Sequence, residues 1–182
     1  RLGFHEKSGF GLKKMGVKLL ANDNQLNMSN LMLQLENSAL TIDSLNIRYD
    51  SLQHITRMTD DVSFQGHLMG NIKLKDLAPI VPAFKDVSRS LNLEMAFMGQ
   101  GKDVNIPLLS LSDKKYVNVG GHANILDWDA KQDMYLEANL SNLSVTKPGI
   151  HYYMNALTGS VPSILQRLEY IQFKGRIDGF MR

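Results

Sequence analysis

Five histidines and one group of acids are the residues of this chain whose types suit metal or acid–base chemistry. The histidines stand apart in the sequence, without the H-x-x-x-H spacing or a comparable ligand spacing. His67 and His122 fall on polar positions of alternating segments, so we interpret both as solvated side chains. The segment DWDAKQD groups Asp127, Asp129 and Asp133 but lacks the glycine and terminal glutamate of an EF-hand loop. We interpret it as a turn between strands.

Catalytic fingerprints are also missing from the sequence. There is no G-x-S-x-G, P-loop or Rossmann glycine motif, and the absence of cysteine excludes disulfides and thiol chemistry. Trp128 is the single tryptophan, whereas a carbohydrate-binding platform usually presents several exposed aromatic rings. We therefore expect no enzyme, no cofactor and no metal site. An enzyme or carbohydrate-binding sandwich stays a third alternative, because acids brought together by folding are invisible in a sequence.

Composition limits the partners of the chain. Its 182 residues suffice for one sizeable core, and we expect residues 1–182 to form a single β-rich segment. A formal charge of +2 with scattered basic residues argues against nucleic acid. The sequence contains no continuous stretch of about 18 apolar residues, the length that a membrane-spanning helix needs. The chain begins with Arg1, and we expect it to be part of a much longer protein.

Alternation of apolar and polar residues dominates the chain and predicts β-strands. From Val62 to Leu74 the even positions are apolar or glycine, and the odd positions are mostly polar. Similar alternation runs through residues 91–97, 117–125 and 134–140. Such strands have one apolar face and one polar face, because successive side chains point to opposite sides.

Three of these segments shift their alternation by one residue in the same way. Two polar residues separate apolar ones in Met28–Leu31, Ile42–Leu45 and Leu140–Leu143, and LKDLAP at Leu74 resembles them. A bulge or a tight corner would keep the apolar residues on one side. We favour corners between the strands of an antiparallel meander. A second, weaker repeat of the form F-x-G-x-[LI]-x-G occurs at Phe64–Gly70 and Phe173–Gly179, where glycine would permit a bend or a close backbone approach.

Helix signals are few. Prolines limit any helix in residues 77–87 to one or two turns, and residues 149–157 suit a helix that Gly159 ends. Ser160 and Pro162 favour another helix start, with Val161, Ile164, Leu165 and Leu168 on one face. So little helix cannot cover a long apolar sheet face. The pattern alone favours closure into a sandwich, and the alternative is an open trough for an apolar ligand.

Several segments resemble the AsmA-like, TamB-type family of envelope proteins. EKSGF (6–10), LMLQLENSALTIDSLNIRYDS (31–51), FQGHLMGNIKLKDLAPIVPAFK (64–85), WDAKQDMYLEANLSNLSVTKPGI (128–150) and FKGRIDG (173–179) are similar to strand and turn segments of that family. The likeness covers most of the chain but includes no catalytic signature. Within residues 1–182 we recognise neither the membrane anchor nor the C-terminal signature of the family, and we expect more helix near residues 150–170 than a groove requires.

The resemblance implies a mainly β fold: an elongated, curved antiparallel sheet, groove-like or an open sandwich, with two or three short helices. It also implies a periplasmic location in a parent protein anchored in the inner membrane. The implied function is phospholipid transport in outer-membrane biogenesis, with acyl chains as the missing layer over the apolar face. The alternative is a scaffold for assembly of outer-membrane proteins, with an outer-membrane barrel protein as partner. The expected lipid-facing lining comprises Val62, Phe64, Leu68, Ile72, Leu91, Leu93, Met95 and Phe97.

Overall fold

The strands of the computed structural model, which describes residues 2–5, 11–78, 84–129 and 133–180, form one antiparallel sheet. They lie side by side in chain order without a crossover, as the meander prediction requires. The strands are β1 (Leu2–His5), β2 (Gly11–Ala21), β3 (Gln25–Gln34), β4 (Ala39–Arg48), β5 (Ser63–Lys73), β6 (Ser90–Gln100), β7 (Asp103–Asp113), β8 (Val117–Leu126), β9 (Tyr135–Thr146) and β10 (Tyr170–Phe180).

The helices lie in the connections between strands. They are α1 (Leu52–Arg57), the 3₁₀ turn η1 (Leu74–Leu77), α2 (Lys147–Thr158) and α3 (Ser163–Gln166). The predicted end of α2 is confirmed, because Gly159 caps it with φ 76°. The helix expected after Ser160 is a single turn that begins after Pro162. Residues 79–83 of the other helix expectation lie outside the described residues, and only the turn at η1 precedes them.

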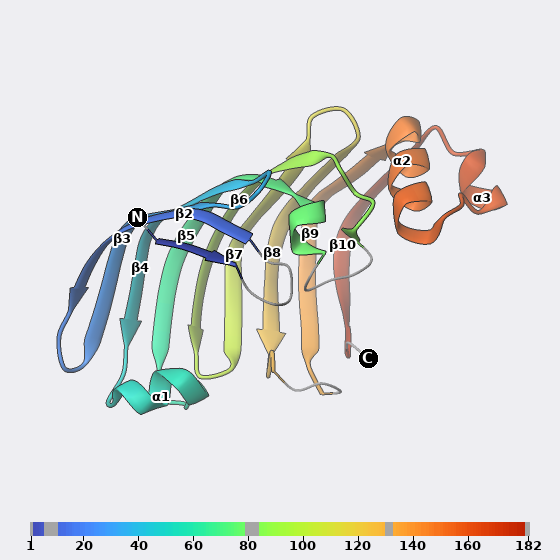
Figure 1. Ribbon diagram of the computed structural model, residues 1–182. Helices are drawn as coiled ribbons and strands as arrows, with labels where there is room; N and C mark the ends of the chain where they lie inside the picture. Colours follow the sequence, from blue (N-terminus) through green and yellow to red (C-terminus); the bar gives the residue numbers. More distant parts are fainter. Residues whose placement is uncertain (1, 6–10, 79–83, 130–132, 181–182) are drawn as a thin grey trace.

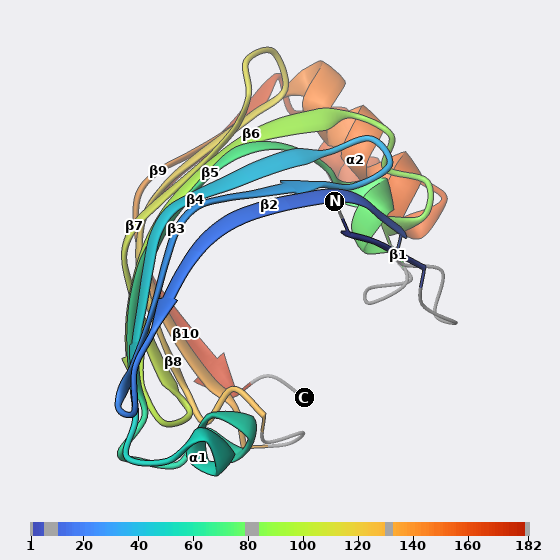
Figure 2. The same cartoon turned by 60° about the vertical axis from the view of Figure 1, so that its left-hand side comes forward.

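The sheet is strongly curved and open. Figure 1 shows the strands running side by side from β2 to β10, and Figure 2 shows each long strand bent along its length into a C. All the described strands belong to this one sheet, so no second sheet packs against it. The sandwich that the pattern alone favours is therefore wrong, and the mainly β, curved antiparallel fold is confirmed.

The shifts in alternation lie inside strands, and the prediction of corners is wrong. Met28–Leu31 belongs to the middle of β3, where Asn30 has φ 52° and is left out of the pairing with β4. Ile42–Leu45 and Leu140–Leu143 lie within β4 and β9, beside register shifts of the neighbouring strands. Each is a bulge, which bends a strand and increases its twist. Leu74–Leu77 differs, because it leaves the sheet as η1.

The glycine repeat serves close packing on one face of the sheet. Gly66 of β5 pairs with Phe97 of β6, and Phe64 pairs with Gly99 in the same two strands. A β-carbon at Gly66 would lie 2.6 Å from Phe97 Cζ, so the ring covers the bare backbone. Aromatic rings that cover cross-strand glycines stabilise curved sheets.

Both ends of the sheet carry small packed clusters. At the end near α1, Val62 is fully buried and Gly101 donates its N–H to the Val62 carbonyl at 2.8 Å. At the opposite end Val87, Leu91 and Ile150 are each at most 3% exposed. The buried side chains thus concentrate where connections fold back over strand ends, and the described residues place no comparable cover over the middle of the sheet.

Candidate functional site

One face of the sheet is apolar from strand to strand. Cross-strand register determines which residues share a face, because paired residues point to the same side. One row across the sheet contains Leu31, Ile42, Leu68, Met95, Leu109, Gly121, Leu140 and Gly175. A neighbouring row contains Leu33, Leu40, Gly70, Leu93, Leu111, Val119, Leu143 and Phe173. The bulges keep these rows on one side of the sheet, and we call this side the apolar face.

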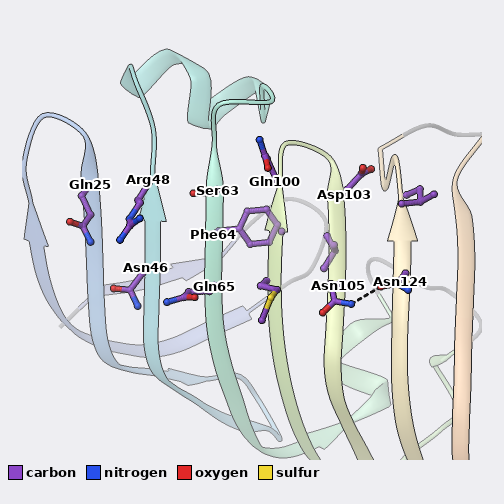
Figure 3. A pocket seen from close by; sticks show the side chains of 14 residues that line it. Gln25, Asn46, Arg48, Ser63, Phe64, Gln65, Gln100, Asp103, Asn105 and Asn124 are labelled. Atoms are coloured by element: carbon purple, nitrogen blue, oxygen red, sulfur yellow. Dashed lines mark hydrogen bonds between the residues drawn. The ribbon is translucent and has the colours of Figure 1, made fainter.

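The apolar face lies on the inner side of the curve. In Figure 3 the polar side chains of the opposite face stand toward the viewer, with the helical segment after β5 behind the sheet. Figure 2 shows that segment on the inner side of the C. The eight strands β3 to β10 span about 34 Å across the sheet, at roughly 4.8 Å per strand. The apolar face is therefore a continuous strip that crosses the strands.

Much of this face is accessible. Most apolar side chains in its middle, including Leu68, Leu93 and Leu111, are half-buried although no second sheet of the described strands covers them. Toward the β10 edge the exposure increases, to 38% for Phe173 and 48% for Ile177. Large apolar areas of this kind on a protein surface mark binding sites.

The structure places the eight predicted lining residues in two environments. Seven belong to β5 and β6 and share the apolar face through the register of those strands. Five of these are half-buried: Phe64, Leu68, Leu93, Met95 and Phe97. Ile72 and Leu91 are buried, at 5% and 1% exposure, near the α2 end of the sheet. Val62 is fully buried and precedes β5, so it supports the strand rather than lining the face.

A single charged side chain occurs among the apolar-face positions of the described strands β3 to β10, and it is neutralised. Asp113 ends β7 on this phase, opposite Val117, and its side chain is 7% exposed. Arg89 donates to it from Nε, and from Nη2 at 3.2 Å. Tyr153 of α2 donates its hydroxyl to Asp113 Oδ2 at 3.4 Å. The cluster therefore keeps an unpaired charge off the apolar strip.

The same cluster fixes α2 on the end of the sheet. The Arg89 guanidinium stacks over the Tyr116 ring at 3.8 Å from its centroid. Tyr152 of α2 accepts hydrogen bonds from the backbone N–H groups of Ser88 at 2.9 Å and Arg89 at 3.1 Å. Figure 1 shows α2 at one end of β9 and β10. Contacts from the β5–β6 and β7–β8 connections thus hold the helix in place.

Electrostatics agree with this arrangement. The hydrogen bond and the charge of Arg89 lower the pKa of Asp113, although burial acts in the opposite direction. Burial and the adjacent Asp113 carboxylate raise the pKa of Tyr153, which keeps its hydroxyl protonated as a donor. The cluster is therefore an ionised Arg89–Asp113 pair hydrogen-bonded to a neutral tyrosine, and its role is to hold α2 against the sheet.

The acids of DWDAKQD do not converge on a metal. Residues 130–132 lie outside the described part of the chain, and Asp129 forms an ion pair with Lys102 at 3.0 Å. Within the described residues no group of three or more potential ligands has metal-site geometry. No helix of that part is long and apolar enough to cross a bilayer.

Sequence reasoning did not find the Arg89–Asp113 cluster or the full width of the apolar face. Tyr152 contacts Ser88 and Arg89, which precede it in the sequence by 64 and 63 positions, and no local pattern signals contacts over such separations. The parity shifts did contain a usable signal. Following the apolar residues through each bulge adds Leu31, Leu33, Leu40 and Ile42 to the face.

Comparison of the chain with protein-family models, with curated proteins and with solved structures gives no match.

Proposed function

We propose that this chain is a periplasmic segment of an AsmA/TamB-like envelope protein and that its apolar face carries phospholipid acyl chains between membranes. The observation that supports the proposal most directly is the continuous row of apolar side chains from β3 to β10, over which the described residues place no covering layer. An acyl chain on this face would supply that layer. The parent protein would be anchored in the inner membrane.

The energetics favour hydrocarbon as the occupant. Each methylene moved from water onto such a face contributes about 0.8 kcal/mol. A neutral, uniformly apolar strip has no polar group to fix one position of the chain, so a lipid can move along it without leaving specific contacts. The pairing of Asp113 with Arg89 neutralises the charge that would oppose this movement.

Lipid bound to the purified chain tests the proposal. We expect native mass spectrometry and organic extraction to detect phospholipid with the wild-type chain after purification from a bacterial envelope fraction. Leu93→Asp places a carboxylate in the middle of the apolar face and should abolish lipid retention. In the parent protein, Leu93→Asp or Phe64→Asp should abolish transport.

Met98→Asp is the matched control for Leu93→Asp. Met98 belongs to the same strand, is 46% exposed and pairs with Gln65 on the opposite, polar face. We expect Met98→Asp to keep lipid and to fold like the wild type. A lipid-free wild-type chain, or equal lipid retention by both variants, would contradict the proposal.

The free edge of β10 favours a second candidate, a scaffold for assembly of outer-membrane proteins. In the described sheet β10 pairs with β9 alone, so its other edge presents unpaired backbone groups. Such an edge can accept an extended client strand. Crosslinks from β10 to outer-membrane strands, together with the absence of lipid crosslinks, would favour this function over lipid transport.

A further inference from the structure

The polar face of the sheet contains a hollow that lipid binding does not use. It has a volume of about 600 Å³ and lies toward the α1 end, across strands β3 to β8. Six of its fourteen lining residues are asparagine or glutamine, contributed by successive strands (Figure 3). Arg48 and Asp103 supply one charge of each sign, so the hollow has little net charge.

Four carboxamides and Met98 form a row that crosses the strands. Asn46 pairs with Gln65, Gln65 with Met98, Met98 with Asn105, and Asn105 with Asn124. Each step is one strand spacing of about 4.8 Å, so the row is about 19 Å long. Its regular spacing suits a linear ligand lying across the strands rather than a compact one.

Several polar side chains of the hollow have no protein partner. Among the described residues, the side chains of Asn46, Gln65 and Arg48 form no hydrogen bond or ion pair. Asn105 donates to the Asn124 side-chain oxygen at 2.6 Å, which leaves the Asn105 oxygen, one Asn105 N–H and both Asn124 side-chain N–H groups available. The hollow therefore offers both donors and acceptors side by side.

The polar face also carries an asparagine pair that lies outside the hollow. Asn71 donates to Asn92 at 3.2 Å near the opposite end of the sheet, and the hollow does not include them. This pair provides an internal comparison for the row.

We propose that the hollow binds a linear, uncharged oligosaccharide that lies across strands β4 to β8. A sugar hydroxyl both donates and accepts a hydrogen bond, and a carboxamide presents one acceptor and two donors to match it. Met98 and Leu126, each 46% exposed, offer apolar contact to the C–H side of sugar rings. Recognition rests on hydrogen bonds, since the row contains no stacked aromatic rings.

The test uses two soluble probes, the β-1,4-linked hexasaccharides of glucose and of N-acetylglucosamine. We expect at least one probe to shift the side-chain amide resonances of Asn46, Gln65 and Asn124 in ¹⁵N-correlated NMR spectra. Isothermal titration should give at least tenfold weaker binding for the double variant Asn46→Ala/Gln65→Ala. The control Asn71→Ala/Asn92→Ala should bind like the wild type. Thermal unfolding establishes that both variants fold.

Three results would overturn the inference. They are no shift with either hexasaccharide at millimolar concentration, equal binding by the Asn46→Ala/Gln65→Ala variant, and occupation of the row by an extended neutral peptide in place of sugar. Lipid retention separates this inference from the proposed function. The Asn46→Ala/Gln65→Ala variant should retain lipid as the wild type does, because its substitutions lie on the opposite face of the sheet.

Discussion

The ring of Phe97 lies over Gly66 of the neighbouring strand, so closely that a β-carbon at Gly66 would be 2.6 Å from Phe97 Cζ. Phe64 covers Gly99 in the same two strands, and the two phenylalanine rings are 6.4 Å apart. These rings close the gaps that glycine leaves on the apolar face. The glycines in turn let the strands bend strongly while the face stays continuous.

Two adjacent glycines of β8 test how tightly the bulge on the apolar face is packed. A β-carbon at Gly121 would lie 2.3 Å from the carbonyl oxygen of Asn139, which belongs to the backbone and cannot move freely. We expect Gly121→Ala to lower the free energy of unfolding by about 1–3 kcal/mol in urea denaturation.

Gly120→Ala is the control for Gly121→Ala. The new β-carbon would lie 3.4 Å from Ser141 Oγ, an ordinary contact. Its effect should stay within about 0.5 kcal/mol. Equal effects of the two substitutions would show that the bulge is looser than described.

The pH dependence of stability tests the Arg89–Asp113 pair. Hydrogen bonding and the charge of Arg89 hold the pKa of Asp113 below the value of about 3.9 in unfolded chains. Its contribution is therefore present at neutral pH and is lost as the pH falls through the folded pKa. Asp113→Asn should lower the free energy of unfolding by about 3 kcal/mol at neutral pH. The free energy of unfolding of the variant should also fall less than that of the wild type on acidification.

A remaining acid dependence is expected in Asp113→Asn. Interactions with Thr59 and His54 lower the pKa of Asp61, and hydrogen bonds from Asn37 and Ser38 lower that of Asp76 despite its partial burial. Identical acid dependence in the variant and the wild type would contradict an ionised Asp113.

The hydroxyl group of Tyr152 contributes two of the hydrogen bonds that anchor α2. Tyr152→Phe removes the acceptor of the Ser88 and Arg89 N–H groups. We expect a loss of about 1–2 kcal/mol in stability and faster amide hydrogen exchange throughout α2. Tyr170→Phe, at a side chain 64% exposed, should change neither quantity. Unchanged exchange in Tyr152→Phe would show that α2 is held by other contacts.

The free edge of β10 should cause self-association of the isolated chain. Ile177 lies on the apolar phase of β10 and is 48% exposed. Ile177→Lys should reduce dimers in sedimentation velocity, because an inward-facing lysine opposes edge pairing. Met69→Lys is the control, since Met69 is 39% exposed in β5 and pairs with Thr41 of β4 and Glu94 of β6. Dimers that persist in Ile177→Lys would exclude the β10 edge as the contact.

Strand alternation predicted the strands well, because one-sided burial leaves a period of two that local sequence reports. The bulges were visible as parity shifts, but a corner produces the same shift, and Met28–Leu31 shows that sequence did not distinguish them. α1 was missed because its six residues contain no buried side chain and depend on the Ser51 cap. The helix expected after Ser160 is only one turn long, because its apolar residue Ile164 is 75% exposed and contributes little packing.

Local sequence pattern could not predict what covers the apolar face or how the strands pair. The sequence shows that a strand has an apolar face but not what lies opposite it, so the expected sandwich was wrong. The amide row containing Asn46, Gln65 and Asn124 depends on the pairing of five strands, and a one-residue slip in any of them would break it.

Mapping of lipid crosslinks onto the sheet tests the central claim most directly. The wild-type chain would be loaded with phospholipid bearing a diazirine in its acyl chain, irradiated, digested and analysed by mass spectrometry. The account predicts adducts on apolar-face residues of several strands, such as Leu68, Met95 and Leu109, and none on Gln65 or Met98 of the polar face. Adducts on both faces alike, or no adducts after confirmed lipid loading, would contradict it.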